Sequence, residues 1–305
     1  MLTIFATPKP FRGHFDVIQR NAIGSWTQLT PAPQIILFGN SEGTKEIANE
    51  FGLEYVPQVE SNEFGTPYLR SLIAEAENRA RHELLCYVNA DIILTGGFEQ
   101  AVKQVRAKMN KFLMVGRRMN MWIKEPIHFD ADWRARLDQE IAAHAFPQDH
   151  TGIDFFVFPK GFYQDIPPLV IGRAWFDQWM IKAALEQGDP VVDTSPLVPV
   201  VHQKHDYTHV EGGSNWVFGG VEAERNLEFC GGKHAYTLLD VSHELTPDGS
   251  IRRVFFRRPM HRAREILWSV AVEKTYPLRK KLGLQRKVRA TTPGASMQAM
   301  RSDEK

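Results

Sequence analysis

Apolar residues along this chain gather in short runs, and longer segments between the runs place apolar residues at helical spacing. Four strand-like runs occupy the first ninety residues, namely Leu2–Ala6, Gln34–Phe38, residues 53–56 and Leu84–Val88. Near-continuous runs of this kind are typical of strands buried on both faces of a parallel sheet. Helical spacing over residues 15–26, Thr44–Phe51 and residues 66–80 predicts a helix after each of the first three strands.

The same alternation continues through the middle of the chain. Strand-like runs lie at residues 112–116, at residues 152–158 and within residues 190–201. Helical patterns cover residues 98–109, the second half of 120–146 and residues 173–185. Two glycine-rich stretches, residues 211–220 and 228–232, are expected to be mobile, either as a lid or as ordinary loops. Together these elements predict an α/β fold in which helices flank a mostly parallel central sheet.

Size and charge divide the chain into two parts. Its 305 residues are 43% hydrophobic and 24% charged, which suits a globular protein with a sizeable core. The net charge is +1, but thirteen lysines and arginines face two acids between Arg252 and Arg289, which leaves −10 for the rest. We therefore expect one domain over residues 1–250 and a basic helical extension with a disordered tail over residues 251–305. The basic run suits an anionic membrane surface, with a solvated tail as the alternative.

The two cysteines and the first residues of the chain bear on its cellular location. Cys86 lies inside a predicted core strand and Cys230 lies beside two glycines, so they form neither a disulfide framework nor a metal-ligand pattern. The chain begins directly with a strand-like run, and no apolar run approaches the length of a membrane span. We expect a cytoplasmic protein, with peripheral contact to the inner membrane face through the basic run.

Polar residues follow the predicted strands where these end. Asn89 and Asp91 follow Leu84–Val88, Thr7 and Lys9 follow the first strand, and Asn40 follows the second. The carboxyl ends of parallel strands are the edge at which open α/β sheets bind ligands. Asp91 can face a cation there, and the Lys9 ammonium can face a phosphate. Turn formation by the Asx residues and an exposed loop lysine are the alternatives.

Metal and base candidates also occur in the second half of the chain. The segment 202–209 contains three histidines, at positions 202, 205 and 209, although their spacing matches no zinc signature. Asp177 lies in the first turn of a predicted helix, where it can serve as a general base or simply complement the helix dipole. Neither G-x-G-x-x-G after the first strand nor a glycine-rich loop ending in Gly-Lys-Ser/Thr occurs. A bound nucleotide would therefore need another source of positive charge, such as a divalent metal on Asp91.

The order of these elements over residues 1–210 resembles the GT-A nucleotide-sugar glycosyltransferases, in particular those similar to glycosyltransferase family 2. Asn89-Ala90-Asp91 resembles the Asp-x-Asp step of that family, with Asn89 in place of the first acid. The resemblance implies that Asp91 binds Mn²⁺ or Mg²⁺ bridging the donor diphosphate. It also implies that His202 or His205 completes the metal shell, and of these we prefer His202. Asp177 matches the position of the general base, although Phe176 replaces the glutamate of the usual Glu-Asp pair.

This resemblance implies a fold of the nucleotide-diphospho-sugar transferase type and a hexosyltransferase-like activity. A sugar would move from a nucleotide-sugar donor to a hydroxyl of a saccharide or lipid-linked acceptor, in a metal-dependent and inverting reaction. Asp177 would take the acceptor proton, and Asp154 would orient sugar or acceptor hydroxyls. Thr7, Lys9, Asn40, Asn89 and Asp91 would then form the donor site.

Two other interpretations fit parts of the same pattern. A sugar-1-phosphate nucleotidyltransferase shares this type of sheet, but it carries a glycine-rich basic segment after the first strand, where this chain has Thr7-Pro8-Lys9-Pro10. A non-catalytic binding protein would explain Asn89 and the missing Glu-Asp pair. Nucleic-acid binding is not expected, because the basic run lacks a known motif and clustered aromatic residues.

Overall fold

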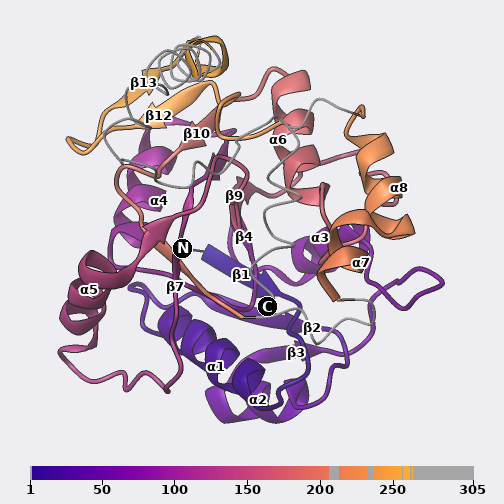
Figure 1. Cartoon of the computed structure of the whole chain (residues 1–305), viewed down its shortest axis with the longest axis vertical. Helices are drawn as coiled ribbons and strands as arrows, with labels where there is room; N and C mark the ends of the chain where they lie inside the picture. Colours follow the sequence, from indigo (N-terminus) through magenta and orange to yellow (C-terminus); the bar gives the residue numbers. More distant parts are fainter. Residues whose placement is uncertain (1, 206–212, 233–235, 256, 262, 264–305) are drawn as a thin grey trace, which may run out of the picture. The chain divides into compact units, whose positions relative to one another are not determined.

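The computed structural model describes residues 2–205, 213–232, 236–255, 257–261 and 263. The chain forms two compact units, Met1–Phe255 and Phe256–Lys305, and the elements named below all belong to the first (Figure 1). Most of the predicted basic extension lies outside the described residues. The predicted boundary after residue 250 stays a prediction, although residues Ile251–Arg253 form the last strand of the central sheet.

The central sheet has nine strands, in the order β13-β12-β10-β6-β9-β4-β1-β2-β3. Its strands are β1 (Leu2–Ala6), β2 (Gln34–Phe38), β3 (Glu54–Val56), β4 (Leu84–Val88), β6 (Leu113–Val115), β9 (Phe155–Pro159), β10 (Val191–Asp193), β12 (His243–Leu245) and β13 (Ile251–Arg253). Most neighbours pair in parallel, while β9 runs antiparallel to β4 and β6, and β13 runs antiparallel to β12. The prediction of an α/β fold with a mostly parallel central sheet is confirmed.

A second, smaller sheet lies beside the first. The sequence analysis predicted only one of its strands, the one that carries His202. It contains β5 (Ile92–Ile93), β7 (Arg118–Met121), β8 (Phe146–Pro147) and β11 (Val200–Gln203), in the order β5-β11-β7-β8. Its register places His202 opposite both Ile92 and Asn120, and Asn120 opposite Phe146. These strands are only two to four residues long, which is too short to show a period of two clearly in the sequence.

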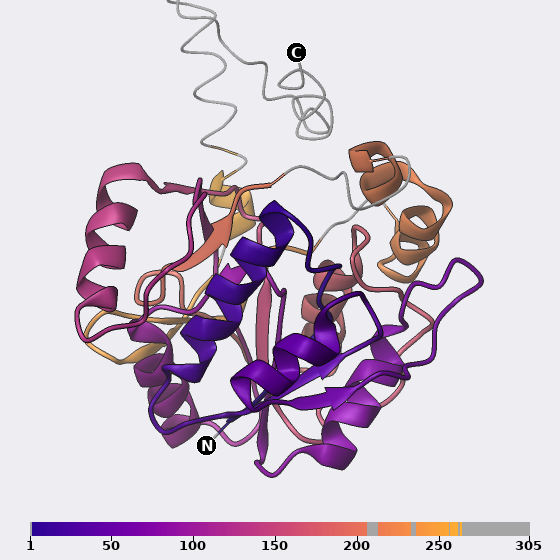
Figure 2. The ribbon, with the colours of Figure 1, turned by 90° about the horizontal axis from the view of Figure 1, so that it is seen from below.

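Helices cover both faces of the central sheet. They are α1 (His14–Thr27), α2 (Thr44–Phe51), α3 (Leu69–Arg79), α4 (Gly97–Lys108), α5 (Trp133–His144), α6 (Phe176–Glu186), α7 (Gly213–Gly219) and α8 (Val221–Phe229). Figure 2 shows α1 and α2 lying side by side along the N-terminal strands. The predicted helices in the first 190 residues are confirmed to within a few residues at each end.

The expectation of a loop at residues 211–220 was wrong, because α7 occupies Gly213–Gly219. At residues 228–232, α8 ends at Phe229 and a turn follows. The described glycines of this region lie at or beyond the helix ends, where glycine is well tolerated, and not in the helix interiors. Packing also stabilises this segment, since Val217, Ala223 and Asn226 are buried. The Asn226 amide bonds both backbone groups of Val170 and so ties α8 to the segment before α6.

Alternate residues of the central strands point into two different cores, which explains their continuous apolar runs. Phe5 and Tyr87 pack with α3 and α6 on one face of the sheet. Ile4 and Cys86, their direct neighbours in the chain, pack with α1, α2 and α4 on the other face. A strand between two helical layers needs apolar side chains at every position, and β4 accordingly has no exposed residue.

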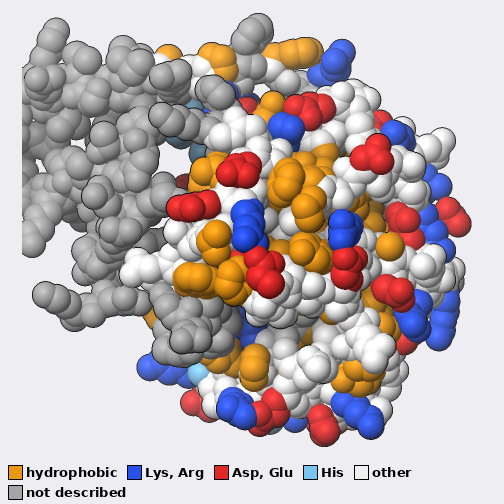
Figure 3. All heavy atoms as spheres, turned by 90° about the vertical axis from the view of Figure 1, so that its right-hand side faces the viewer, with side chains coloured by type: hydrophobic (Ala, Val, Ile, Leu, Met, Phe, Trp, Pro, Cys, Tyr) orange, Lys and Arg blue, Asp and Glu red, His pale blue; other side chains and the backbone are white. Residues whose placement is uncertain are grey.

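The surface over α3, α6, α7 and α8 carries interspersed charges of both signs (Figure 3). Several pair directly, for example Arg225 with Glu63 and Arg173 with the buried Glu222. Cys86 and Cys230 are both buried as free thiols. In the part of the chain that the structure describes, no helix has the length and apolar character needed to cross a bilayer.

Candidate functional site

Asp91 lies at the centre of a charged cluster at the carboxyl edge of the central sheet. It follows β4 and its residue surface is only 4% exposed. Its Oδ2 accepts a hydrogen bond from the Lys9 ammonium at 2.7 Å and lies 3.0 Å from His205 Nε2. The Lys9 ammonium is also 3.0 Å from that imidazole nitrogen. Lys9 and Asp91, which follow different parallel strands, thus meet at one edge as their positions predicted.

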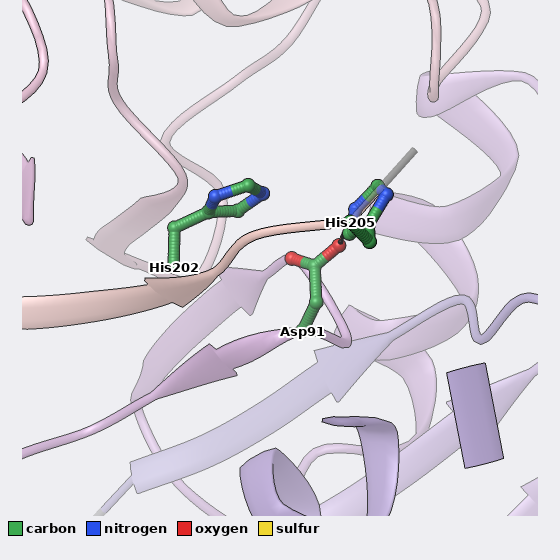
Figure 4. Close-up of side chains that lie close together, drawn as sticks. All are labelled: Asp91, His202 and His205. Carbon is green, nitrogen blue, oxygen red and sulfur yellow. Dashed lines mark hydrogen bonds and ion pairs between the residues drawn. The ribbon is translucent and has the colours of Figure 1, made fainter. Parts of the chain in front are cut away.

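Strand pairing brings both histidines to Asp91. In β11, His202 is paired with Ile92 of β5, and Ile92 directly follows Asp91 in the chain. Figure 4 shows the Asp91 carboxylate and the two imidazoles on the same side of these strands. One ligand atom from each of the three side chains lies within 4.8 Å of the others. His202 is further oriented by Asn120, whose Oδ1 is 3.2 Å from Nδ1, while His209 lies outside the described residues.

This cluster has the chemistry of a divalent-cation site. Asp91 Oδ1 is buried and has no hydrogen-bond partner among the described residues, which costs about 1–3 kcal/mol unless a cation or another ligand satisfies it. One carboxylate with two imidazoles is a donor set for a divalent transition metal, whereas magnesium prefers oxygen ligands. Asp91, His202 and His205 therefore fit a divalent cation, with Lys9 already occupying the other carboxylate oxygen.

The charges around the cluster fix its protonation. Burial would raise the pKa of Asp91, but the Lys9 ammonium and the contact with His205 hold this pKa well below its ordinary value. Burial, together with the Arg118 cation, lowers the pKa of His202 well below its ordinary value. Asp91 is therefore an anion and His202 a neutral imidazole at neutral pH, and these are the forms that bind metals.

A second buried network surrounds Asp154, just before β9. Asp154 is 6% exposed, and its Oδ1 accepts a hydrogen bond from Asn89 Nδ2 at 2.7 Å. Its Oδ2 accepts one from Arg118 Nη1 at 2.9 Å. The Tyr87 hydroxyl donates to Asn89 Oδ1 at 3.1 Å, which fixes the orientation of the amide. Both Asp154 oxygens therefore have protein partners, and the predicted role of Asp154 in orienting substrate hydroxyls stays a prediction.

Asp177 lies in the first turn of α6, as predicted, and the charges of the same network shift the pKa of its carboxyl. Burial and the nearby Asp154 carboxylate raise the pKa of Asp177 to about 7, against a smaller lowering by Arg118 and the amides of the helix start. A carboxyl with a pKa near the working pH can accept a proton from a hydroxyl more effectively than an ordinary aspartate. This property makes Asp177 the best-placed candidate for a general base.

The backbone directly before α6 is strained. Trp175, at the N-cap position, has φ of 85° and ψ of −16°, a left-handed conformation that side chains disfavour. Its carbonyl accepts a hydrogen bond from the Cys230 thiol at 2.9 Å, and the preceding Ala174 bonds Val217 through its amide. Strain of this kind persists where surrounding contacts impose it, often beside a functional residue.

This strain predicts an inverted order of stability for two substitutions. Trp175→Gly should be more stable than Trp175→Ala by about 1–2 kcal/mol, because only alanine keeps the left-handed penalty. Urea unfolding of the two variants measures the difference. The same pair at Trp179, inside α6, should show the opposite order, because glycine disfavours helix interiors. Equal stability of the two Trp175 variants would mean that the backbone relaxes there.

The other predicted donor residues are placed at the same sheet edge but outside the cluster. Thr7 follows β1, and its hydroxyl is buried with no hydrogen-bond partner in the described part of the chain. Asn40 follows β2 and is exposed. Among the described residues, no hydrogen bond or ion pair connects either of them to Asp91.

Arg118 is the residue that the sequence interpretation missed. It bonds Asp154, and its charge acts on both Asp177 and His202, so it links the two halves of the site. Its sequence signal was the basic pair Arg117-Arg118, which follows the buried strand ending at Val115 after a single glycine. That position is again the carboxyl end of a strand, where a cation indicates an anionic partner.

No family model and no curated protein matches this chain. Among solved structures, it is similar to a Desulfovibrio desulfuricans G20 protein described as a nucleotide-diphospho-sugar transferase, with 10% identity and a TM-score of 0.40 over 75% of this chain and 96% of that one. It is also similar to S. aureus TarS in complex with UDP-GlcNAc, with 12% identity and a TM-score of 0.44 over 68% of this chain and 60% of TarS. The TarS complex with UDP gives 13% identity and a TM-score of 0.30 over 39% of this chain and 36% of that one.

Proposed function

We propose that this protein is a glycosyltransferase that moves a sugar from a nucleoside-diphosphate donor to an acceptor hydroxyl. The observation that carries the proposal is the juxtaposition of two kinds of group at one sheet edge. Lys9, Asp91, His202 and His205 form a buried cluster suited to a cation and a phosphate. Asp177, tuned to a pKa of about 7, belongs to the network next to it. Departure of a diphosphate and deprotonation of a hydroxyl require these two functions.

The donor half of the mechanism is the neutralisation of negative charge. Asp91, His202 and His205 would hold Mn²⁺ or Mg²⁺. A divalent cation, when bound, supplies positive charge to the leaving diphosphate. Lys9 would contact the same diphosphate through its ammonium, and Thr7, Asn40 and Asn89 would line the rest of the donor site.

The acceptor half is proton removal by Asp177. Its carboxylate would accept the proton of an acceptor hydroxyl as that oxygen attacks the anomeric carbon opposite the leaving group. A direct displacement of this kind inverts the anomeric centre. Arg118 would hold Asp154 beside Asp177, so that the like charge keeps the pKa of Asp177 raised.

A thermal-shift panel tests the donor half. The intact protein is heated with UDP-, GDP-, CMP- and dTDP-sugars, each with and without Mn²⁺. One nucleotide class should stabilise the protein only with metal, by about 2.7 kcal/mol at a ligand concentration of about 100 times Kd. Asp91→Ala should remove this increment, because it deletes the carboxylate that anchors the cation.

The matched control for Asp91→Ala is Asp165→Ala, at an exposed aspartate before α6. It should retain the full donor shift. Absence of any shift with the wild-type protein would contradict the proposal and favour a non-catalytic binding protein. Release of pyrophosphate from a nucleoside triphosphate would instead identify a sugar-1-phosphate nucleotidyltransferase. Location in the cytoplasm and membrane contact between Arg252 and Arg289 rest on the sequence alone.

A further inference from the structure

One face of the second sheet packs against α5, and the other face carries polar and aromatic side chains beside the buried Val200. In β7 and β11, the side chains of Met121 and Val201 pack against Trp133 and Leu137 of α5. Side chains in the opposite phase belong to the other face, since successive residues of a strand alternate. Strand register adds Phe146, directly opposite Asn120. This polar face carries, along β7, β8 and β11 and their ends, Arg118, Asn120, Trp122, Phe146, His202 and Lys204.

The polar face runs from the candidate site outward. Its inner end is Arg118, which bonds Asp154. Its middle is the Asn120–His202 contact of 3.2 Å. Its outer end is Trp122, roughly 13 Å from Arg118 along an extended strand at about 3.3 Å per residue. Because β8 is the edge strand of the sheet, Phe146 lies on the side of His202 away from β5 and Asp91.

Aromatic rings dominate the outer end. Trp122 is 61% exposed and Phe146 is 45% exposed. The Lys204 ammonium lies 4.9 Å from the Trp122 ring centroid and 5.3 Å from that of Phe146. The backbone amide of Lys204 bonds the Met121 carbonyl, which fixes this segment beside β7. We call Trp122, Phe146 and Lys204 the aromatic platform.

We propose that the aromatic platform binds a saccharide chain that carries carboxylate or phosphate groups, as the outer part of the acceptor site. The flat C–H face of a pyranose ring packs on an exposed aromatic ring, while its hydroxyls remain in water. The Lys204 ammonium between the two rings attracts an anionic substituent on the same sugar. The inference rests on the proposed function, because it takes the platform to bind the part of the acceptor that lies away from the reacting hydroxyl.

The position of the platform favours the acceptor over the donor nucleotide. Thr7, Lys9 and Asn40 follow β1 and β2, whereas the platform lies past His202 on the second sheet. Arg118, at the inner end of the same face, acts on Asp177. A chain with its terminal hydroxyl at Asp177 and its next units along the face would reach the rings. The platform thus favours an oligomeric acceptor, because a single sugar is shorter than the roughly 13 Å between Arg118 and Trp122.

Calorimetric titration with defined saccharides tests this assignment. The probes are hexamers of galacturonate, as the anionic chain, and of N-acetylglucosamine, as the neutral chain. Galacturonate should bind the intact protein, and Trp122→Ala and Phe146→Ala should each weaken it by about tenfold. Lys204→Gln should weaken galacturonate about tenfold while leaving any binding of the neutral hexamer unchanged.

Phe64→Ala is the matched control. Phe64 is also an exposed ring, at 49%, and an arginine, Arg225, lies 5.9 Å from its centroid, but it belongs to the loop before α3. It should bind galacturonate like the wild type. Circular dichroism melting of each variant checks that the fold is retained.

Two results would overturn the proposal that the platform binds a saccharide. One is no binding of galacturonate by the wild type, and the other is equal affinity of the platform variants and Phe64→Ala for galacturonate. Binding to vesicles of phosphatidylcholine and phosphatidylglycerol that is lost in Trp122→Ala, without saccharide binding, would assign the rings to a membrane instead. The donor thermal shift, measured on the same variants, separates the two proposals. If the donor causes no thermal shift in the wild type, the proposed transferase function is contradicted. If the donor shift is normal but no saccharide binds, only the proposed role of the aromatic platform is contradicted.

Discussion

Replacing Asp177 with asparagine should lower sugar transfer by about 10²- to 10⁴-fold while leaving the donor thermal shift unchanged. The amide keeps the size of the side chain at the start of α6 but cannot accept the hydroxyl proton. Release of nucleoside diphosphate, with the donor identified by the thermal-shift panel, measures the loss. Asp165→Asn, at an exposed position, should remain fully active. Full activity of Asp177→Asn would exclude Asp177 as the base.

The pH dependence of the wild type should report the same carboxyl. Because the base must be deprotonated, transfer should rise with pH through about 7, where burial and Asp154 have placed the pKa of Asp177. Stability should follow the opposite trend. Between the ordinary aspartate pKa and about 7, the folded state holds a proton that the unfolded state has released, so stability falls as pH rises through this window. Asp177→Asn should lack both effects.

The second large effect is expected at Asn89. Asn89→Asp restores the Asp-x-Asp pattern of GT-A enzymes, and yet it should destabilise this protein by about 1–3 kcal/mol at pH 8. The Asn89 amide donates to Asp154 Oδ1 at 2.7 Å, and a carboxylate in its place would face another carboxylate. The loss should shrink at pH 5, because one shared proton restores the hydrogen bond. Urea unfolding at the two pH values measures it.

Two further variants make this result specific. Asn110→Asp places the same new charge at an exposed position beside Arg106, where it should cost little. The reciprocal exchange, Asn89→Asp with Asp154→Asn, restores a donor and an acceptor and should recover part of the lost stability. If Asn89→Asp alone keeps full stability and strengthens metal-dependent donor binding, then Asn89 is a replaceable remnant of the motif rather than a partner of Asp154.

The parts of this fold that the sequence predicts are those encoded locally. The runs Leu2–Ala6 and Leu84–Val88 are apolar at every position because each strand lies between two helical layers, and that pattern needs no knowledge of partners. In contrast, β5, β7 and β8 exist only through their pairing with β11 and with each other. Segments of two to four residues are too short to carry a period that distinguishes such strands from loops.

The same division applies to the candidate site. Lys9 and Asp91 could be placed together because both follow parallel strands of one sheet. Arg118 could not, since its importance depends on Asp154, which enters the sheet 36 residues later. Asn89 looked like a weakened metal ligand, whereas its amide is the hydrogen-bond donor that the buried Asp154 requires. The assigned roles of all these residues stay predictions until the variants are measured.

The antiparallel direction of β9 has a consequence for the order in which the protein assembles. Because β9 runs against β4, the chain enters β9 at the edge where it leaves β4, so Asp154 meets Asn89 across a separation of 65 residues. His202 joins Asp91 from still farther along the chain. A nascent chain that ends before β9 already contains β1 to β4 but none of these partners. Cation binding should therefore be acquired late in folding, and its onset would report completed long-range assembly rather than formation of the first helices and strands.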